Sequence, residues 1–420
     1  MRVSRQNIGS PVTSRLPGTD DSRVLLSSVV QDYPGAVTDM NFSPKIGLRR
    51  LSTIRWWLSF LYLVLPTSCI SQSSPAGTIA HPRQQFIAVA PEVRLEVLDW
   101  GGSGRNVVLL AGGGRTAHVY ASLAPKLATQ FHVFGITRRG SGQSSAPPSG
   151  YTAKQFGDDV VAVLDALHLT DPVLIGHSIA GEEMSAVSKY HPGRASALIY
   201  LDAGASFALY NPEHGDIYID RVELQDDLSK LGHNLFDDVL ITKTLADEAR
   251  YRRNLQDLRD EIEGAEAPSP TAADRSSIAS FQKYFTGYYG GILPEDEIRQ
   301  QYQITATGAI GDRIGQPIAN KANEIEYERF TILDTRALVI IPFPDALNTG
   351  VTHDPEKLAA YKAQEASRME AQIAIWRKQP NVEVVVIPNV THYIFLSDES
   401  KVISLITRFV ADLPRTSILR

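Results

Sequence analysis

The stretch that decides the fold is Pro172-Val173-Leu174-Ile175-Gly176-His177-Ser178-Ile179-Ala180-Gly181. An apolar run too short for a helix leads into a serine framed by small residues, and a helix is predicted to follow. This pattern is typical of a strand that turns sharply into a helix and holds a serine hydroxyl above the edge of a sheet. Gly176 and Ala180 are small enough for so tight a turn, although the strict G-x-S-x-G form has glycine where Ala180 stands. Ser178 is therefore a candidate nucleophile.

The composition is that of an ordinary soluble globular protein. Of 420 residues, 43% are hydrophobic and 21% are charged, and the formal net charge is −6. With no basic stripe interleaved with aromatic residues, we expect no nucleic-acid partner. Cys69 is the one cysteine, so no intrachain disulfide forms, and no Cys/His spacing indicates zinc. Gly112-Gly113-Gly114 lacks the spacing of a dinucleotide-binding loop, and we expect no cofactor.

The first eighty residues differ from the rest. Residues 1–39 are rich in Ser, Pro, Gly and Asp without hydrophobic periodicity, which predicts disorder or an over-extended N-terminus. Translation is expected to start near Met40 instead.

Residues 40–80 have the layout of a signal peptide and linker. Basic residues precede an apolar run over 56–65, and a small and polar tail follows it. Cleavage is expected after Ala76 or Ala80, which predicts export to the periplasm or the medium and no stable membrane span after processing. The run is shorter than the ~20 residues that span a bilayer. An anchor through residues 56–70 and a buried helix remain the alternatives, and Leu65–Cys69 resembles a lipoprotein site apart from Pro66.

From about residue 84 the chain alternates strands and helices. Short apolar or alternating runs predict strands at 86–90, 93–98, 106–111, 131–136, 172–176 and 197–201, the first two as an antiparallel pair. Helices are expected over 121–127 and 153–167. This alternation with short loops predicts an α/β fold, a doubly wound and mostly parallel sheet.

Two loops resemble those of the α/β-hydrolase superfamily. Residues 138–144 (RRGSGQS) are similar to the R-G-x-G-x-S loop after its fourth strand, with Thr137 at a position that is usually acidic. Residues 109–114 (LLAGGG) stand where the family has His-Gly and its oxyanion loop, and Ala111 replaces the histidine. The resemblance implies a catalytic domain of residues 81–204 and 336–420.

In this fold the catalytic triad follows the chain order Ser, acid, His. His392 lies after the predicted last strand, 382–387, where the family places its base. Asp345, after the penultimate strand at 337–341, is the expected acid, and its carboxylate would fix the imidazole tautomer. Asp202, at the end of an earlier strand, is the alternative acid, and Asp354 is a third candidate.

The resemblance also implies an oxyanion hole. Backbone N–H groups of Gly113 and Ile179 are expected to hold the oxyanion, each such donor being worth about 3 kcal/mol. A glycine at position 113 lets the backbone approach the substrate closely. The alternative is that residues 112–114 form only a tight turn.

Residues 205–335 interrupt the strand–helix rhythm, at the place where α/β-hydrolases carry a helical cap. Helices are predicted over 222–231, 236–262, 279–289 and 295–303. Five aromatic residues at helical spacing form either the buried face of a helix or a substrate pocket: Phe281, Tyr284, Phe285, Tyr288 and Tyr289.

Four polar residues near the predicted site can be explained without a catalytic or substrate-binding role. Arg115 and His118 could face substrate, but exposed polar residues in a loop are commoner. Glu182 and Glu183 begin the helix after Ser178, where negative charge complements the helix dipole.

The resemblance implies a cofactor-independent serine hydrolase acting on a small or medium carboxylic ester, a small-molecule substrate. The alternatives are a proline-type aminopeptidase, a carbon–carbon bond hydrolase and a non-catalytic binding protein. An aminopeptidase would hold a substrate amine with acidic groups of the cap, for which Glu261, Glu263 and Glu266 are candidates. Epoxide and haloalkane hydrolysis are disfavoured because those enzymes have aspartate where this chain has Ser178. The sequence does not indicate an oligomeric state.

Overall fold

The computed structural model of the chain describes residues 81–264, 269–314, 327–346 and 355–414. The predictions for residues 1–80, for Asp354 and for Glu266 fall outside these ranges. So do the side chains of Glu261 and Glu263.

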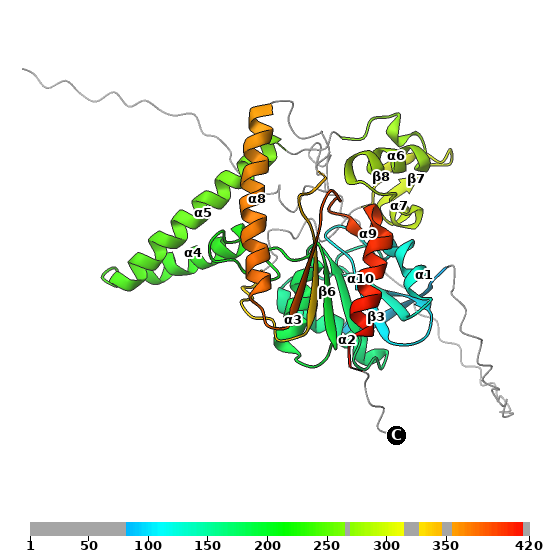
Figure 1. Ribbon diagram of the computed structural model, residues 1–420, viewed down its shortest axis with the longest axis horizontal. Coiled ribbons are helices and arrows are strands. Elements are labelled where there is room, and N and C mark those ends of the chain that lie inside the picture. Colours follow the sequence, from blue (N-terminus) through cyan, green and yellow to red (C-terminus); the bar gives the residue numbers. More distant parts are fainter. Residues whose placement is uncertain (1–80, 265–268, 315–326, 347–354, 415–420) are drawn as a thin grey trace, which may run out of the picture.

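An eight-stranded sheet forms the centre of the protein, in the order β1-β2-β4-β3-β5-β6-β9-β10 (Figure 1). The antiparallel pair predicted at its start is confirmed, since β1 pairs with β2 from Arg83↔Asp99 to Ala90↔Val93. β2 is also antiparallel to β4, and all other neighbouring strands are parallel. The strands are β1 (Arg83–Ala90), β2 (Val93–Gly101), β3 (Asn106–Leu110), β4 (His132–Ile136), β5 (Val173–His177), β6 (Ala197–Leu201), β9 (Ala337–Pro342) and β10 (Val382–Ile387). The predicted α/β fold class is therefore confirmed.

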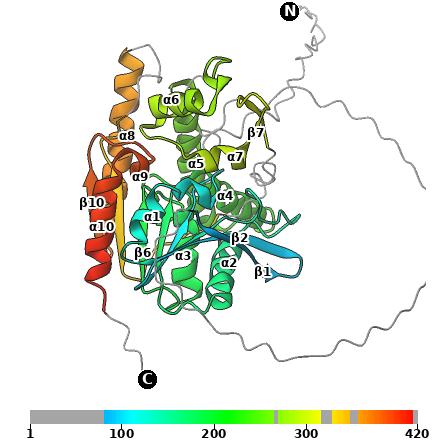
Figure 2. The same cartoon turned by 90° about the vertical axis from the view of Figure 1, so that its right-hand side faces the viewer.

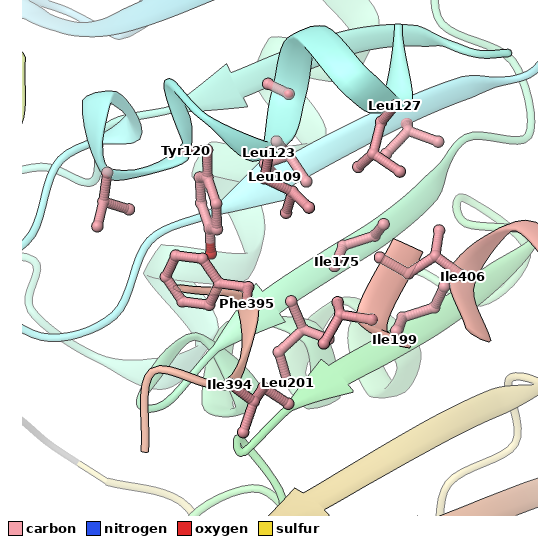
Figure 3. Close-up of a cluster of buried hydrophobic side chains, with 14 of the residues drawn as sticks. Leu109, Tyr120, Leu123, Leu127, Ile175, Ile199, Leu201, Ile394, Phe395 and Ile406 are labelled. Carbon is pink, nitrogen blue, oxygen red and sulfur yellow. The ribbon is translucent and has the colours of Figure 1, made fainter. Parts of the chain in front are cut away.

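Apolar side chains are buried on both faces of this sheet, which is why its central strands are nearly continuous apolar runs. Along β3, Val107 and Leu109 belong to one core cluster, and Val108 and Leu110 belong to the other. Figure 3 shows the first cluster, where Leu109 and its neighbours from β5 and β6 face Leu123 and other side chains from the covering helices.

Helices cover each face. One face packs against α1 (Leu123–Leu127), preceded by the 3₁₀ turn η1 (Ala117–Tyr120), and against α9 (Ile394–Ser397) and α10 (Glu399–Ala411). The other face packs against α2 (Ala153–Ala166), α3 (Ala180–Tyr190) and α8 (Pro355–Arg377). Figure 2 shows α1 and α10 together on one flank.

Between β6 and β9 lies a mainly helical segment, called here the insert. It contains α4 (Ile217–Leu231), α5 (Asp238–Gly264), η2 (Asp274–Ser276), α6 (Ile278–Tyr289), α7 (Glu295–Gln301), β7 (Tyr302–Ile304) and β8 (Ile310–Arg313). The α4–α5 pair lies beside α8, whereas α6, α7 and the β7–β8 hairpin lie beyond α9 and η1 (Figure 1). The insert thus has two parts on different sides of the strand ends.

Two local expectations need correction. The helix predicted over 121–127 starts at Leu123, after a 3₁₀ turn. The helix predicted over 295–303 ends at Gln301, because the next residues pair with β8 as β7. The long helix α8 and the β7–β8 hairpin were not predicted.

Candidate active site

Ser178 occupies the sharp turn between β5 and α3. Its φ of +54° is unusual for a residue with a side chain, and such conformations persist where the surrounding structure enforces them. The turn is held by the Gly181 N–H, which donates to the Ser178 carbonyl over 2.9 Å. A Cβ at position 176 would lie 2.7 Å from Met184 Cε, and one at 181 would lie 2.1 Å from the Ala203 carbonyl oxygen. Close packing against backbone therefore requires a glycine at position 181, whereas a side chain at position 176 would require Met184 to move.

His392 lies in the loop between β10 and α9, and its imidazole is hydrogen-bonded to a carboxylate. Nδ1 lies 2.6 Å from Asp202 Oδ2, with both side chains partly buried. His177, the residue before Ser178, donates from Nε2 to the His392 carbonyl over 3.0 Å, and the two rings are 4.5 Å apart. The histidine loop is therefore fastened directly to the serine turn.

The carboxylate bonded to His392 is that of Asp202, the alternative acid, and not that of Asp345, which the sequence placed first. β6 and β9 are neighbours, and the Asp202 N–H donates to the Ile340 carbonyl over 2.9 Å. The loops after both strands therefore reach the same edge of the sheet, and the sequence could not show which carboxylate would face the imidazole. Asp202 has a φ of +44°, so its backbone, too, is held in an uncommon conformation.

Asp345 lies close to this pair without joining it. Its Oδ1 is buried with no hydrogen-bond partner. Burial and the nearby Asp202 carboxylate raise the pKa of Asp345 to about 7, against a smaller opposing effect of His392. Two carboxyl groups thus share the surroundings of one imidazole, and only one of them is bonded to it.

The glycine loop packs against the serine turn. A Cβ at Gly112 would lie 2.7 Å from His177 Nδ1 and 3.1 Å from Ser178 Cβ, so a larger residue would not fit. A Cβ at Gly113 would lie 3.6 Å from Ile179 Cγ2. The two residues predicted to supply oxyanion donors are therefore neighbours in space.

Arg115, for which an exposed loop position seemed the commoner case, is only 5% exposed and links three segments. Its Nε donates to Tyr393 Oη and its Nη1 to Gln301 Oε1, both over 2.9 Å. It lies 5.4 Å from the centres of the Phe285 and Tyr393 rings. One guanidinium thus joins the glycine loop, the histidine loop and α7 of the insert.

Further buried hydrogen bonds fasten α7 to the glycine loop. Glu297, 0% exposed, accepts from the Thr116 N–H over 3.2 and 3.3 Å and from the Thr116 hydroxyl over 2.5 Å. Gln301 Nε2 donates to the Gly114 carbonyl over 2.8 Å. Sequence reasoning missed these contacts, because α7 follows the loop by some 180 residues.

His118 contacts a carboxylate of the sheet. Its Nε2 lies 3.0 Å from Glu96 Oε1, and this interaction raises the pKa of His118 against the opposing effect of burial, which is the larger single influence. Thr137, at the position expected to be acidic, donates to Glu96 Oε2 over 2.7 Å. A carboxylate from β2 therefore stands beside Thr137.

The aromatic residues of α6 are in part core. Phe281 and Phe285 are 3% and 2% exposed, which favours the buried-face alternative for these two. Phe285 packs on the Tyr393 ring at 5.3 Å, and the Thr391 hydroxyl donates to the Tyr289 carbonyl over 2.5 Å. The end of α6 is therefore seated on the loop that carries His392.

Glu182 and Glu183 are both buried, at 1% and 4% exposure. Glu183 accepts a hydrogen bond from Arg138 Nε, whereas Glu182 Oε1 has no partner. Burial is the main cause of the raised pKa of both residues. Because burial disfavours the charged form of Glu182, complementing the helix dipole does not by itself account for this residue.

Within the described ranges, no group of three or more His, Cys, Asp and Glu side chains is placed to hold a metal ion. No helix in this part of the chain has the length and apolar character needed to cross a membrane.

Comparison with known proteins supplies a family and several partial relatives. The model of the alpha/beta hydrolase fold family matches residues 105–399. A protein named as a carbamate hydrolase, from Caulobacter segnis, is 34% identical over 110 residues, 26% of this chain and 41% of its own length. Bifunctional epoxide hydrolase 2 of Sus scrofa is 30% identical over 140 residues, 33% of this chain and 24% of its own length. The chain therefore spans less than half the length of the curated relatives it matches.

Among solved structures, E-2-(acetamidomethylene)succinate hydrolase is similar over 79% of this chain and 100% of its own. Its sequence identity is 18% and the TM-score is 0.47.

Proposed function

This chain belongs to the alpha/beta hydrolase fold family, and from that premise we propose that it is a serine hydrolase cleaving small or medium carboxylic esters. The observation that carries the proposal is the 2.6 Å hydrogen bond between His392 Nδ1 and Asp202, on a loop fastened to the Ser178 turn. A serine at the nucleophile turn, an imidazole on the loop fastened to it and a carboxylate bonded to that imidazole are the groups that acyl transfer uses, which supports the proposal.

In the proposed reaction, His392 Nε2 takes the Ser178 proton while Oγ attacks the ester carbonyl carbon. Asp202 holds the proton on Nδ1, so that Nε2 carries the lone pair and acts as the base, and Asp202 stabilises the imidazolium. The tetrahedral intermediate collapses, the imidazolium protonates the leaving alkoxide, and an acyl-enzyme remains. Water, deprotonated by the same imidazole, then releases the acid and restores the serine.

The N–H groups of Gly113 and Ile179 are proposed to hold the oxyanion. Their support is the closeness of the two residues, since a Cβ added at Gly113 would lie 3.6 Å from Ile179 Cγ2, and the buried anchoring of the glycine loop through Arg115 and Glu297. The insert is proposed to act as a cap, because α6 and α7 contact both the histidine loop and the glycine loop.

The other reactions considered have less support. Epoxide hydrolysis, named for one relative, uses an aspartate nucleophile in this fold, and this chain has Ser178. The acidic residues suggested for an aminopeptidase lie where the structure describes no side chains. Carbon–carbon hydrolysis would use the same residues and is an outcome of the test below.

The test is hydrolysis of p-nitrophenyl esters of graded acyl length by the full chain, with Ser178→Ala as the control. Turnover that disappears in the variant is the expected result, and the optimal length measures the acyl pocket. Activity that survives in the variant would show that another residue is the nucleophile. No turnover by either protein would reject ester hydrolysis and direct the assay to diketone and peptide substrates.

Export also remains a proposal, resting on the basic and apolar segments within residues 40–80. Sequencing the N-terminus of the protein from its native host tests it. A start after Ala76 or Ala80 supports processing, and a start at or before Met40 contradicts it.

A further inference from the structure

The helix pair formed by α4 and α5 exposes apolar side chains along its outer surface. In Figure 1 the tip of this pair points away from the sheet. Phe236, in the turn before α5, is 95% exposed, and Val239 and Leu245 are 80% and 64% exposed. Along α5, exposed side chains recur at spacings of three and four residues and therefore share one face of the helix, called here the α5 stripe: Val239, Thr242, Leu245, Ala246 and Ala249.

The surface that α4 and α5 share, by contrast, contains charged groups. Lys243 of α5 forms ion pairs with Asp227 of α4 and with Asp247, and both carboxylates are buried. Thr244 is buried on the same helix. A surface helix of a soluble protein normally turns its apolar side inward and its polar side to water. The N-terminal half of α5 buries charges and exposes the stripe, which favours a protein surface over water as the neighbour of the stripe.

Buried hydrogen bonds hold the helix pair at its base. Asp220 of α4 is fully buried and accepts from Arg250 Nε over 2.9 Å and from Asn254 Nδ2 over 2.8 Å, both in α5. The hydroxyl of Tyr210, in the segment after β6, also donates to Asp220. These bonds fix the direction of the pair relative to the sheet. A surface that is fixed in this way loses little conformational entropy when a partner binds to it.

Opposite charges at the two ends of the stripe indicate which partner fits it. Asp238 is exposed at the N-terminal end, and Arg253 is exposed about four helical turns later. Two α5 helices that run in opposite directions about a twofold axis can place Asp238 of each copy beside Arg253 of the other. In that register Thr242 of one copy faces Ala249 of the other, and such small side chains let two helices approach closely. Parallel pairing would bring like charges together, which is unfavourable.

A membrane surface fits these charges less well. Asp226 and Asp238 are both exposed and lie near the tip that carries Phe236. Anionic lipid headgroups attract basic segments and repel acidic ones. Helices that lie in a membrane interface typically carry Lys and Arg beside their apolar face. The acidic tip therefore favours a second copy of the chain over a lipid surface.

We propose that the α5 stripe is a dimer interface, in which α5 packs antiparallel against α5 of a second copy of this chain. Asp238 and Arg253 form an intermolecular ion pair at each end, because the same contact occurs twice about a twofold axis. The inference goes beyond the proposed function and does not depend on it, since it concerns a surface formed by the insert and not the hydrolytic residues.

Sedimentation velocity of the full chain over a concentration series tests the interface, and a reversible dimer is expected. Asp238→Arg and Arg253→Asp should each weaken the dimer about tenfold or more, because each substitution brings like charges together at both ends. An equimolar mixture of the two variants should dimerise again, because every charge in the mixed dimer faces its opposite. The rescue requires pairing between copies, so a change of fold within one copy does not imitate it.

A second pair of variants tests the apolar part of the stripe. Leu245→Glu should weaken the dimer about tenfold or more, because it places a carboxylate in the interface. Ile332→Glu is the matched control, because Ile332 is 69% exposed but lies outside α4 and α5, and it should leave association unchanged. Circular dichroism should show the same thermal unfolding for both variants as for the wild type, since both side chains are exposed.

Three results would overturn the proposal. A wild-type chain that stays monomeric at every concentration has no such interface. Association that persists unchanged in Leu245→Glu and in both charge variants would place the contact elsewhere. A monomer that floats with phosphatidylcholine vesicles, and no longer does so as Phe236→Asp, would show that the tip binds lipid instead.

Discussion

The buried polar groups around Ser178 form two sets that differ in whether their hydrogen bonds are complete. On the side of α7, Arg115 donates to Tyr393 and Glu297 accepts from Thr116, with donor–acceptor distances of 2.5 to 3.3 Å. On the side of the aromatic cluster that contains Phe156 and Tyr327, Glu182 and Tyr327 are also buried, yet each has an unpartnered atom. Asp202 and Asp345 differ in the same way, since Asp202 is hydrogen-bonded to His392 and Asp345 Oδ1 has no partner.

This difference separates two uses of buried polarity. A completed network holds a loop in one position, and removing a member leaves its former partners unsatisfied. Removing a polar group whose hydrogen bonds are incomplete costs the free protein little stability. Such a group contributes free energy only when a ligand or a proton is bound. Pairs of identical substitutions, one in each set, therefore measure the contrast.

The largest effect is expected for the two acids. Asp202→Asn should lower kcat by about 10⁴-fold, because the amide no longer holds the imidazole in the tautomer that leaves Nε2 as the base. Asp345→Asn should change kcat by less than tenfold. Steady-state kinetics on the preferred p-nitrophenyl ester measure both, and a larger loss in Asp345→Asn would restore Asp345 as the acid.

The next pair compares Glu297→Met with Glu182→Met. The first removes the acceptor of the Thr116 N–H and a buried carboxylate that interacts with the Arg115 charge, and it should cost about 3 kcal/mol in the free energy of unfolding. The second removes a carboxyl with an unpartnered oxygen and should cost less than about 1 kcal/mol. Urea unfolding gives both numbers, and equal losses would contradict the division into two sets.

Asp345 should make stability depend on pH. Its pKa is about 7 in the folded protein and near its usual value of 3.8 when unfolded. The folded state then binds the proton more tightly, so this contribution is complete below about pH 4 and declines as the pH rises to about 7. Asp345→Asn removes the decline and should stabilise the protein relative to wild type by on the order of 1–3 kcal/mol at pH 8, with a smaller difference at pH 5. Thermal unfolding at the two pH values tests this, and a difference independent of pH would refute it.

The smallest contrast is between two tyrosine hydroxyls. Tyr393→Phe removes the acceptor of Arg115 Nε and should cost about 1 kcal/mol of stability. Tyr327→Phe removes a hydroxyl without a partner and should change stability by less than about 0.5 kcal/mol. Chemical denaturation with both variants at one pH resolves a difference of this size, and a reversed order would mean that Tyr327 is the better bonded residue.

Much of this molecule was predictable because its signals are local. The turn at Ser178, the strands around it and the position of His392 after β10 each follow from a short stretch of sequence. The helix α8 also had a local signal, since Pro355 begins it and residues rich in Ala, Glu, Lys and Gln follow. That signal was overlooked.

The remaining features depend on contacts between distant segments. The sequence could not show that Asp202 rather than Asp345 is hydrogen-bonded to His392, because both residues follow neighbouring strands and only the backbone turn at each position decides which carboxylate meets the imidazole. Arg115 resembles an exposed loop residue until α7 and Tyr393 are packed around it. The unpartnered oxygen of Glu182 has no counterpart in any sequence pattern.

The hydrogen bonds that join Arg115 and the glycine loop to α7 have a consequence for chimeras in which the insert is exchanged between relatives. In this protein the segment that would select the substrate is also the segment that supports the glycine loop, through Glu297 and Gln301. A chimera that received a foreign insert would lose the scaffold of its own catalytic loop together with its old specificity. Grafting here would succeed only with donors that carry a matching carboxylate and amide on the equivalent helix, which makes this insert a poor interchangeable module.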